Sequence, residues 1–317
     1  MKRLLLLPLL AVCACNKSSE TKKPEGGGDK PVVVASIFPL HDLVRRIGGD
    51  KIESKLLLEP GKSEHNYVGS AKDAKVVSRA KVAFLIGLAM DEWTEKIVTA
   101  SGGSAKIVEL GEIVGGKLIP LPRFEEEHPE GEKPAAPEER EAGEEHHHDH
   151  SGIDPHLWLS IPKVKQMTPE IEKALAEAFP ESKEVFTANR TKLDGELDAL
   201  HDEVKKKVGA MTNKRIITFH GSFGYFAEEY GVEIAAVVEP SPGKEPSAAY
   251  LRKILSAVAA KQPLAVFTEP QLDPKPAEVL GKEGSLPVRQ LDPIGGVPGR
   301  DSYELLMRFN AESLAAP

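Results

Sequence analysis

The stretch RIITFHGSFGYFAEEYG, residues 215–231, decides the fold class. It begins with a short, mostly apolar run rich in β-branched residues, which is typical of a buried strand. Residues 223–230 then have the composition of an amphipathic helix, and the polar residue His220 stands at the junction. The same order of strand and helix recurs along most of the chain. Such alternation predicts parallel sheets flanked by helices.

Two sets of four short apolar runs predict two similar lobes. The expected strands of the first set are residues 32–36, 52–58, 82–86 and 106–110, and those of the second set are residues 215–219, 233–238, 264–268 and 288–291. Helices are expected between them, for example over residues 40–47, 71–80, 92–100, 223–230 and 248–260. We therefore expect an α/β protein in which each lobe has a four-stranded parallel sheet flanked by helices.

The region between the two sets predicts helices only. Residues 162–179 form one expected helix, which Pro180 ends, and residues 181–208 form a long, charged helix with apolar residues at helical spacing. A helix of about 28 residues is about 40 Å long, enough to join two lobes rigidly. The expected domains are an N-terminal lobe over residues 31–180, a linker helix over 181–209 and a C-terminal lobe over 210–317. His201, inside the linker helix, is interpreted as a packing or surface histidine.

The N-terminus has the features of an export signal. Met1-Lys2-Arg3 is followed by LLLLPLLAV and then by the only two cysteines of the chain, Cys13 and Cys15. The apolar run is too short to span a bilayer, so residues 1–15 predict a signal peptide. VCAC resembles the bacterial lipoprotein processing box, in which Cys15 is the favoured lipidated residue and Cys13 the alternative. An ordinary signal with incidental cysteines is the other interpretation.

The residues that follow predict a tether at a membrane surface. Residues 16–30, NKSSETKKPEGGGDK, are polar and rich in glycine and lysine, which is typical of a flexible segment. A lipid anchor and a tether would place a soluble body outside the cytoplasm at a bacterial membrane, in the periplasm or at the cell surface.

An acidic, histidine-rich tract covers residues 124–150. It contains five of the ten histidines, namely His128, His146, His147, His148 and His150. It has almost nothing apolar to bury, which predicts a disordered loop. Its net charge is −9, so the rest of the chain carries about +1 of the total of −8, and no basic stripe supports nucleic-acid binding. Imidazoles among carboxylates indicate an accessory loop that collects transition-metal ions, whereas a plain solvated loop is the alternative.

Three further histidines predict an ordered metal site. Ligands of open α/β sheets bind beyond the carboxyl ends of the strands. His65 follows the expected strand 52–58, His220 follows the strand 215–219, and His156 ends the acidic tract in the sequence Asp154-Pro155-His156. Three imidazoles and one oxygen would form the tetrahedral shell that suits zinc.

Several groups are candidates for the fourth ligand. Asp292 follows the expected strand 288–291, and Glu64 precedes His65. Water is a third possibility. Glu269 follows the strand 264–268, but its carboxylate would equally suit the cap of the helix that follows.

Eight motifs together carry a family resemblance. They are SIFPL (36–40), GKSEHNY (61–67), GLAMDEW (87–93), DPHLWL (154–159), TFHGSFGYFAEEYG (218–231), EPSPGKEPS (239–247), FTEPQL (267–272) and LDPIG (291–295). In this order and spacing, from about residue 32 to the C-terminus, the chain resembles the zinc-type, ZnuA-like substrate-binding proteins of bacterial metal ABC importers, within the cluster A-I family.

The resemblance implies a site and a role. It implies that His65, His156 and His220 bind the metal, with Asp292 as the first choice for the fourth ligand, Glu64 as the second and water as the third. Manganese-type relatives have a glutamate where this chain has His220, so zinc is favoured. The implied role is capture of Zn²⁺ as a transported ligand and its delivery to an ABC permease, by a monomeric protein that is not an enzyme.

Other functions remain open at this point. A manganese- or iron-binding protein of the same family and an adhesin lipoprotein are the alternatives with the same fold. A zinc hydrolase is a third alternative, although the sequence contains no HExxH motif.

Overall fold

The computed structural model of the chain describes residues 30–115, 118–120 and 152–316. All the elements named below belong to the unit Pro31–Pro317. The predicted signal peptide, tether and acidic tract lie outside the described residues, as do Cys13, Cys15 and the five histidines of the tract. The domain boundaries drawn from the sequence therefore stay predictions.

The first lobe contains the predicted parallel sheet. Its strands are β1 (Val32–Ala35), β2 (Glu53–Leu56), β3 (Ala80–Leu85) and β4 (Lys106–Glu109), in the order β2-β1-β3-β4. The helices around it are α1 (Phe38–Gly48), α2 (Ala71–Val77) and α3 (Trp93–Ala100). Every residue of the central strand β1 is buried, because helices cover both faces of a parallel sheet. The four predicted strands and three predicted helices of this lobe are confirmed.

The second lobe repeats the same strand order. Its strands are β5 (Arg215–Thr218), β6 (Glu233–Val237), β7 (Val266–Thr268) and β8 (Val288–Gln290), in the order β6-β5-β7-β8 and all parallel. Its helices are α6 (Gly224–Tyr230), α7 (Ala248–Lys261) and α8 (Lys275–Glu283). Helix α6 ends at Gly231, which has the left-handed conformation that glycine adopts readily (φ 68°). The predicted strands are confirmed, and α8 is an addition to the prediction.

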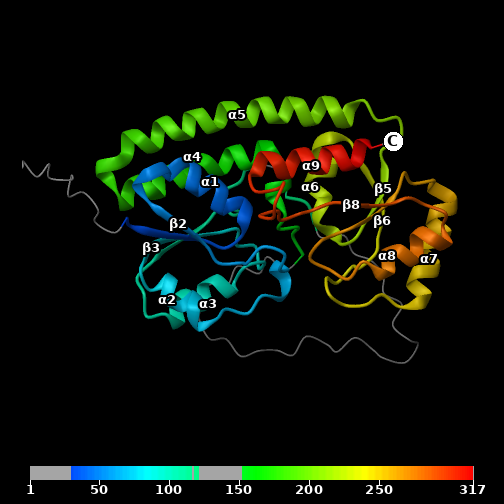
Figure 1. Cartoon of the computed structure of the whole chain (residues 1–317), viewed down its shortest axis with the longest axis horizontal. Coiled ribbons are helices and arrows are strands. Elements are labelled where there is room, and N and C mark those ends of the chain that lie inside the picture. The colour runs from blue at the N-terminus through cyan, green and yellow to red at the C-terminus, as the bar shows by residue number, and fades with distance from the viewer. Residues whose placement is uncertain (1–29, 116–117, 121–151, 317) are drawn as a thin grey trace, which may run out of the picture. The chain divides into compact units, whose positions relative to one another are not determined.

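Three further helices pack along the two lobes. They are α4 (Ile161–Ala178), α5 (Lys183–Gly209) and the C-terminal helix α9 (Tyr303–Ala315), which the sequence did not predict. Helix α5 has 27 residues and runs past both sheets (Figure 1). Arg46 of α1 forms ion pairs with Glu196 of α5 and Glu304 of α9, so the side chain joins all three helices. Over the described residues, no helix is both long and apolar enough to cross a bilayer.

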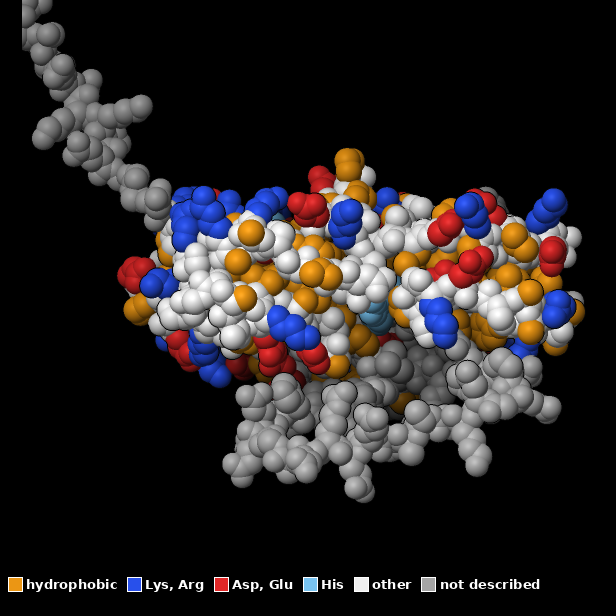
Figure 2. Space-filling model, turned by 90° about the horizontal axis from the view of Figure 1, so that it is seen from below, with side chains coloured by type: hydrophobic (Ala, Val, Ile, Leu, Met, Phe, Trp, Pro, Cys, Tyr) orange, Lys and Arg blue, Asp and Glu red, His pale blue; other side chains and the backbone are white. Residues whose placement is uncertain are grey.

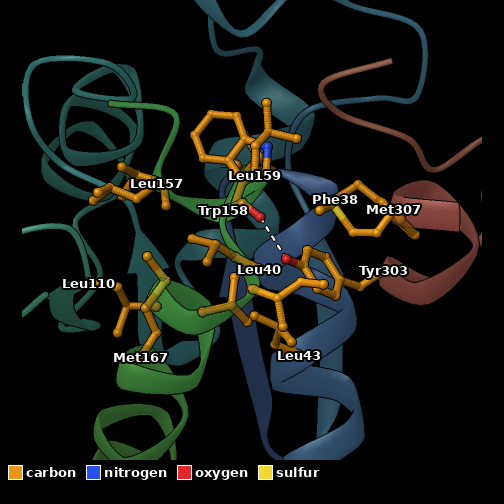
Figure 3. Close-up of a cluster of buried hydrophobic side chains, with 14 of the residues drawn as sticks. Phe38, Leu40, Leu43, Leu110, Leu157, Trp158, Leu159, Met167, Tyr303 and Met307 are labelled. Carbon is orange, nitrogen blue, oxygen red and sulfur yellow. Dashed lines mark hydrogen bonds between the residues drawn. The ribbon is translucent and has the colours of Figure 1, made fainter. Parts of the chain in front are cut away.

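One hydrophobic core extends through both lobes. It includes side chains from both sheets and from α1, α4, α5 and α9. Trp158 is fully buried within it (Figure 3). The Trp158 indole Nε1 donates a hydrogen bond to the Pro293 carbonyl at 2.6 Å, and the Tyr303 hydroxyl donates to the Trp158 carbonyl at 2.7 Å. Because the lobes share a packed interior, their relative position is fixed.

Candidate metal centre

Four side chains from both lobes converge on one point. Glu64 and His65 lie in the short 3₁₀ helix η2 (Glu64–Asn66) after β2, His156 precedes η3 (Leu157–Leu159), and His220 follows β5. One ligand atom from each of them lies within 4.8 Å of all the others. Glu64, His156 and His220 are buried, whereas the His65 side chain is 23% exposed. Histidine surface is visible between the two lobes on the face shown in Figure 2.

Four of the six distances between these atoms are close to those in a tetrahedral zinc shell. The Nε2 atom of His220 lies 3.4 Å from that of His65 and 3.3 Å from that of His156. Glu64 Oε1 lies 3.5 Å from His65 Nε2 and 3.7 Å from His156 Nε2. Zinc–nitrogen bonds of about 2.0–2.1 Å place the ligand atoms of a tetrahedron about 3.3 Å apart. The arrangement therefore has room for Zn²⁺ at its centre.

One ligand atom is otherwise unsatisfied. Glu64 Oε1 is buried and has no hydrogen-bond partner. A buried carboxylate oxygen without a partner is costly, and a bound cation removes that cost. Three imidazoles and one carboxylate form a donor set that suits Zn²⁺.

Carboxylates orient two of the imidazoles. His156 Nδ1 donates to Asp154 Oδ1 at 2.7 Å, and His220 Nδ1 donates to Glu269 Oε2 at 2.5 Å. Since Nδ1 is the donor, Nε2 of each neutral ring presents its lone pair to the metal. Glu269, a weaker ligand candidate from the sequence, thus orients His220 and does not belong to the group of four. The sequence interpretation gave Asp154 no role, although its position two residues before His156 is a usable signal.

Asp292, the first choice for the fourth ligand from the sequence, lies away from the three histidines. Asp292 is fully buried but lies outside the group of four. Its Oδ1 accepts hydrogen bonds from Gln271 Nε2 and from the backbone N–H groups of Ile294 and Gly295, and its Oδ2 lies 3.2 Å from Arg300 Nε. The Asp292 carboxylate organises its own turn, and Glu64 is the carboxylate that lies beside the three imidazoles.

His201 lies apart from the site, in accordance with its interpretation as a packing residue. It extends from α5, and its Nδ1 lies 3.2 Å from the Tyr230 hydroxyl. Its ring packs against that of Tyr230, with centroids 5.6 Å apart.

The site contains groups of opposite charge at neutral pH. Burial lowers the pKa of His65 to about 3, and the neighbouring imidazoles add to this effect against the charge of Glu64. Burial also disfavours charged His156, but Asp154 and Glu64 outweigh it and raise its pKa to about 9. For Glu64, burial favours the neutral acid, but contact with His156 and the charges of the three histidines hold its pKa at about 2. An ion that binds His156 Nε2 at neutral pH would therefore displace a proton from the ring.

The fold and the site together define a class of protein. Two α/β lobes that share a core, with a metal-type site between them, are typical of a binding protein for a small ion. The family model for zinc-uptake complex component A, periplasmic, matches residues 33–316. The chain belongs to this family, which confirms the resemblance to the zinc-type substrate-binding proteins of ABC importers.

Two curated relatives are similar over most of this chain. The high-affinity zinc uptake system protein ZnuA of Brucella abortus (strain 2308) is 32% identical over 323 residues, which cover 90% of this chain and 91% of that protein. The zinc-binding lipoprotein AdcA of Streptococcus pneumoniae serotype 4 is 27% identical over 321 residues, which cover 99% of this chain and 60% of that protein.

A solved structure has the same fold. The crystal structure of ZnuA superposes with a TM-score of 0.74 at 24% sequence identity, over 90% of this chain and 98% of that one. This likeness confirms the predicted α/β fold with two four-stranded parallel sheets. The family description places its members in the periplasm, in agreement with the extracytoplasmic location expected from the sequence.

Proposed function

We propose that this chain binds Zn²⁺ outside the cytoplasmic membrane through Glu64, His65, His156 and His220, and delivers it to the permease of an ABC importer. The observation that carries the proposal is the convergence of four ligand atoms within 4.8 Å of one another. Membership of the zinc-uptake family and the zinc-binding names of the relatives support the same function.

The donor set favours zinc over manganese. Three of the four donors are imidazole nitrogens, whereas Mn²⁺ is suited by carboxylate, carbonyl and water oxygens in octahedral shells. Asp292, a buried carboxylate of the second lobe, is hydrogen-bonded within its own turn. The site therefore offers one carboxylate ligand in a compact tetrahedron.

A competition titration of the full chain tests this function. Zn²⁺ and Mn²⁺ would each compete with a chromophoric chelator, and zinc is expected to bind much more tightly. The triple variant H65A/H156A/H220A is expected to lose the high-affinity site and to keep only weak binding by the histidines of the acidic tract. H201A is the matched control, because it removes a histidine outside the site. Tight zinc binding by the triple variant would overturn the ligand assignment.

We propose further that the protein is a carrier and not an enzyme. A catalytic zinc keeps an open coordination position for water or substrate, whereas four protein donors complete this tetrahedron. The zinc-loaded protein is expected to hydrolyse neither esters nor peptides. Turnover that is abolished by H156A would instead favour the hydrolase alternative.

The remaining part of the proposal concerns the N-terminus and the acidic tract. Cys15, or Cys13 as the alternative, would carry a lipid anchor. The folded body would be monomeric. The acidic tract, residues 124–150, would collect zinc near the metal site. Mass spectrometry of the mature N-terminus identifies the acylated cysteine. C15S is expected to release the protein from the membrane fraction, and unchanged membrane association of a C13S/C15S variant would contradict the anchor.

A further inference from the structure

His65 lacks the support that the other two histidines have. His156 and His220 each donate Nδ1–H to a buried carboxylate. Within the described part of the chain, no carboxylate bonds to Nδ1 of His65, and its side chain is the most exposed of the four. The turn that carries Glu64 and His65 must therefore be fixed in another way.

Trp93 contacts this turn directly. Its indole Nε1 donates a hydrogen bond to the backbone carbonyl of Glu64 at 3.1 Å. Its ring packs edge-on against Tyr67, with ring centroids 4.6 Å apart and an interplanar angle of 64°. The Tyr67 hydroxyl is in turn bonded to Asp73 Oδ2 at 2.8 Å, at the capped start of α2. Trp93 thus fixes the chain on both sides of His65.

The position of Trp93 is itself determined by the sheet. Asp91 is fully buried and accepts hydrogen bonds from the Ser36 hydroxyl at 2.5 Å and from the N–H groups of Ile86 and Gly87 at 2.8 Å each. These donors lie at the carboxyl ends of β1 and β3, and the Asp91 carbonyl accepts from Thr94 N–H at 2.8 Å at the start of α3. A continuous chain of contacts therefore joins the sheet to the metal site.

The backbone between β3 and α3 is strained. Gly87, Leu88 and Ala89 all have positive φ, at 75°, 52° and 62°. Residues other than glycine rarely adopt positive φ, and such strain persists only where surrounding contacts enforce it. Here the hydrogen bonds of Asp91 enforce a turn that directs Trp93 towards Glu64.

We propose that Trp93 is a positioning residue for the fourth ligand: its hydrogen bond to the Glu64 carbonyl holds the Glu64 carboxylate against the three imidazoles. The proposal rests on the proposed function, since it assumes that Glu64 binds the metal. Glu64 and His65 are adjacent in one short turn, so both side chains reach the same ion only in one backbone conformation. Loss of this hydrogen bond releases the Glu64 end of the turn, whereas the Ser63 hydroxyl still accepts from His65 N–H, so a site of three histidines is expected to remain.

The test compares W93F, E64Q and the double variant W93F/E64Q in the full chain. W93F keeps an apolar ring but removes the N–H donor, and zinc affinity is expected to fall about 3- to 10-fold, the usual effect of one hydrogen bond. In the E64Q background W93F is expected to have little further effect, because Trp93 acts through Glu64. S101A is the matched control, since it removes two side-chain bonds at the other end of α3, one to the Val98 carbonyl and one from Gly103 N–H.

The visible spectrum of bound cobalt(II) distinguishes a positioning role of Trp93 from a purely structural one. The intensity and position of its visible bands report the number and type of ligands in the shell. W93F is expected to change the cobalt spectrum in the same direction as E64Q, whereas S101A leaves the wild-type spectrum.

The outcomes separate this proposal from the proposed function. If the wild type itself fails to bind zinc tightly, the proposed function is wrong. If the wild type binds but W93F matches it, or if the effects of W93F and E64Q add in full, the positioning role is wrong. Should W93F fail to fold, D91N tests the same contacts with the tryptophan retained, and it is expected to reproduce the E64Q cobalt spectrum; a wild-type spectrum would overturn the proposal.

Discussion

The Nε2 atoms of His156 and His220 lie 3.3 Å apart, although 64 residues separate them in the chain. His156 adjoins Trp158 in the core that both lobes share, and His220 follows β5 of the second lobe. Each imidazole is oriented by its own carboxylate, Asp154 or Glu269. Two of the proposed ligands are thus held in place by the protein itself, so we expect metal binding to require little rearrangement of the lobes.

The carboxylates behind the histidines are expected to contribute to zinc affinity. D154N and E269Q should each weaken zinc binding about 10- to 100-fold, because such partners fix the ring and raise the basicity of the ligand nitrogen. Chelator competition measures the change. D273N is the control. Asp273 is an exposed acid that pairs with Lys275 and lies in the second lobe, as Glu269 does. Wild-type affinity in both variants would contradict the assigned roles.

Zinc affinity is expected to rise with pH between about 7 and 9. The pKa of His156 is raised to about 9, so its ring is protonated below that pH and zinc must displace the proton. The pKa of His65 is lowered to about 3 and that of Glu64 to about 2, so neither group competes in this range. Calorimetry in buffers of different ionisation heat should show release of about one proton per zinc near pH 7.5. Release of no proton would refute the prediction.

The free energy of unfolding of the metal-free protein is expected to fall as the pH rises, whereas zinc affinity rises. A histidine whose folded pKa lies above its ordinary value of 6.5 stabilises the fold fully below pH 6.5, and this contribution is lost as the pH rises through about 9. Urea unfolding of chelator-treated protein should therefore show a lower free energy of unfolding at pH 9.5 than at pH 6.5. The difference should shrink in H156N, which lacks the titrating ring.

Asp292 is expected to matter for stability more than for zinc. D292N retains the shape of the side chain but weakens a buried acceptor that serves Ile294 N–H, Gly295 N–H and Gln271. A cost of about 1–3 kcal/mol in the free energy of unfolding is the usual consequence. The loss of zinc affinity should be much smaller than in E64Q. A larger loss in D292N would restore Asp292 as a ligand.

The hydrogen bond between Tyr303 and Trp158 is expected to stabilise the shared core. Y303F leaves the buried Trp158 carbonyl without its partner, at a cost of about 1–3 kcal/mol. The urea midpoint should fall while the slope of the transition stays constant. In Y250F, the comparison variant, the lost bond to the Val237 carbonyl is only partly buried, so a smaller shift is expected.

The fold was largely predictable from the sequence because its signals are local. The four central strands, β1, β3, β5 and β7, are short and mostly apolar runs, and strand–helix alternation predicts parallel sheets. Helix α9 was not predicted, since its packing against α5 and α1 depends on contacts between distant segments. The order of the strands likewise followed only from the structure.

The sequence by itself predicted the two-lobed α/β class and singled out the three histidines that the structure brings together, because each histidine adjoins a recognisable motif or strand end. The tertiary structure decided which carboxylate joins them. Glu269 and Asp292 each follow a strand, Glu64 adjoins His65 in the turn after β2, and all three are buried. Their roles differ because each carboxylate has different neighbours: Glu269 accepts from His220, Asp292 serves its own turn, and Glu64 is left unpaired at the site. Such competition between hydrogen-bond partners arises only when distant parts of the chain come together.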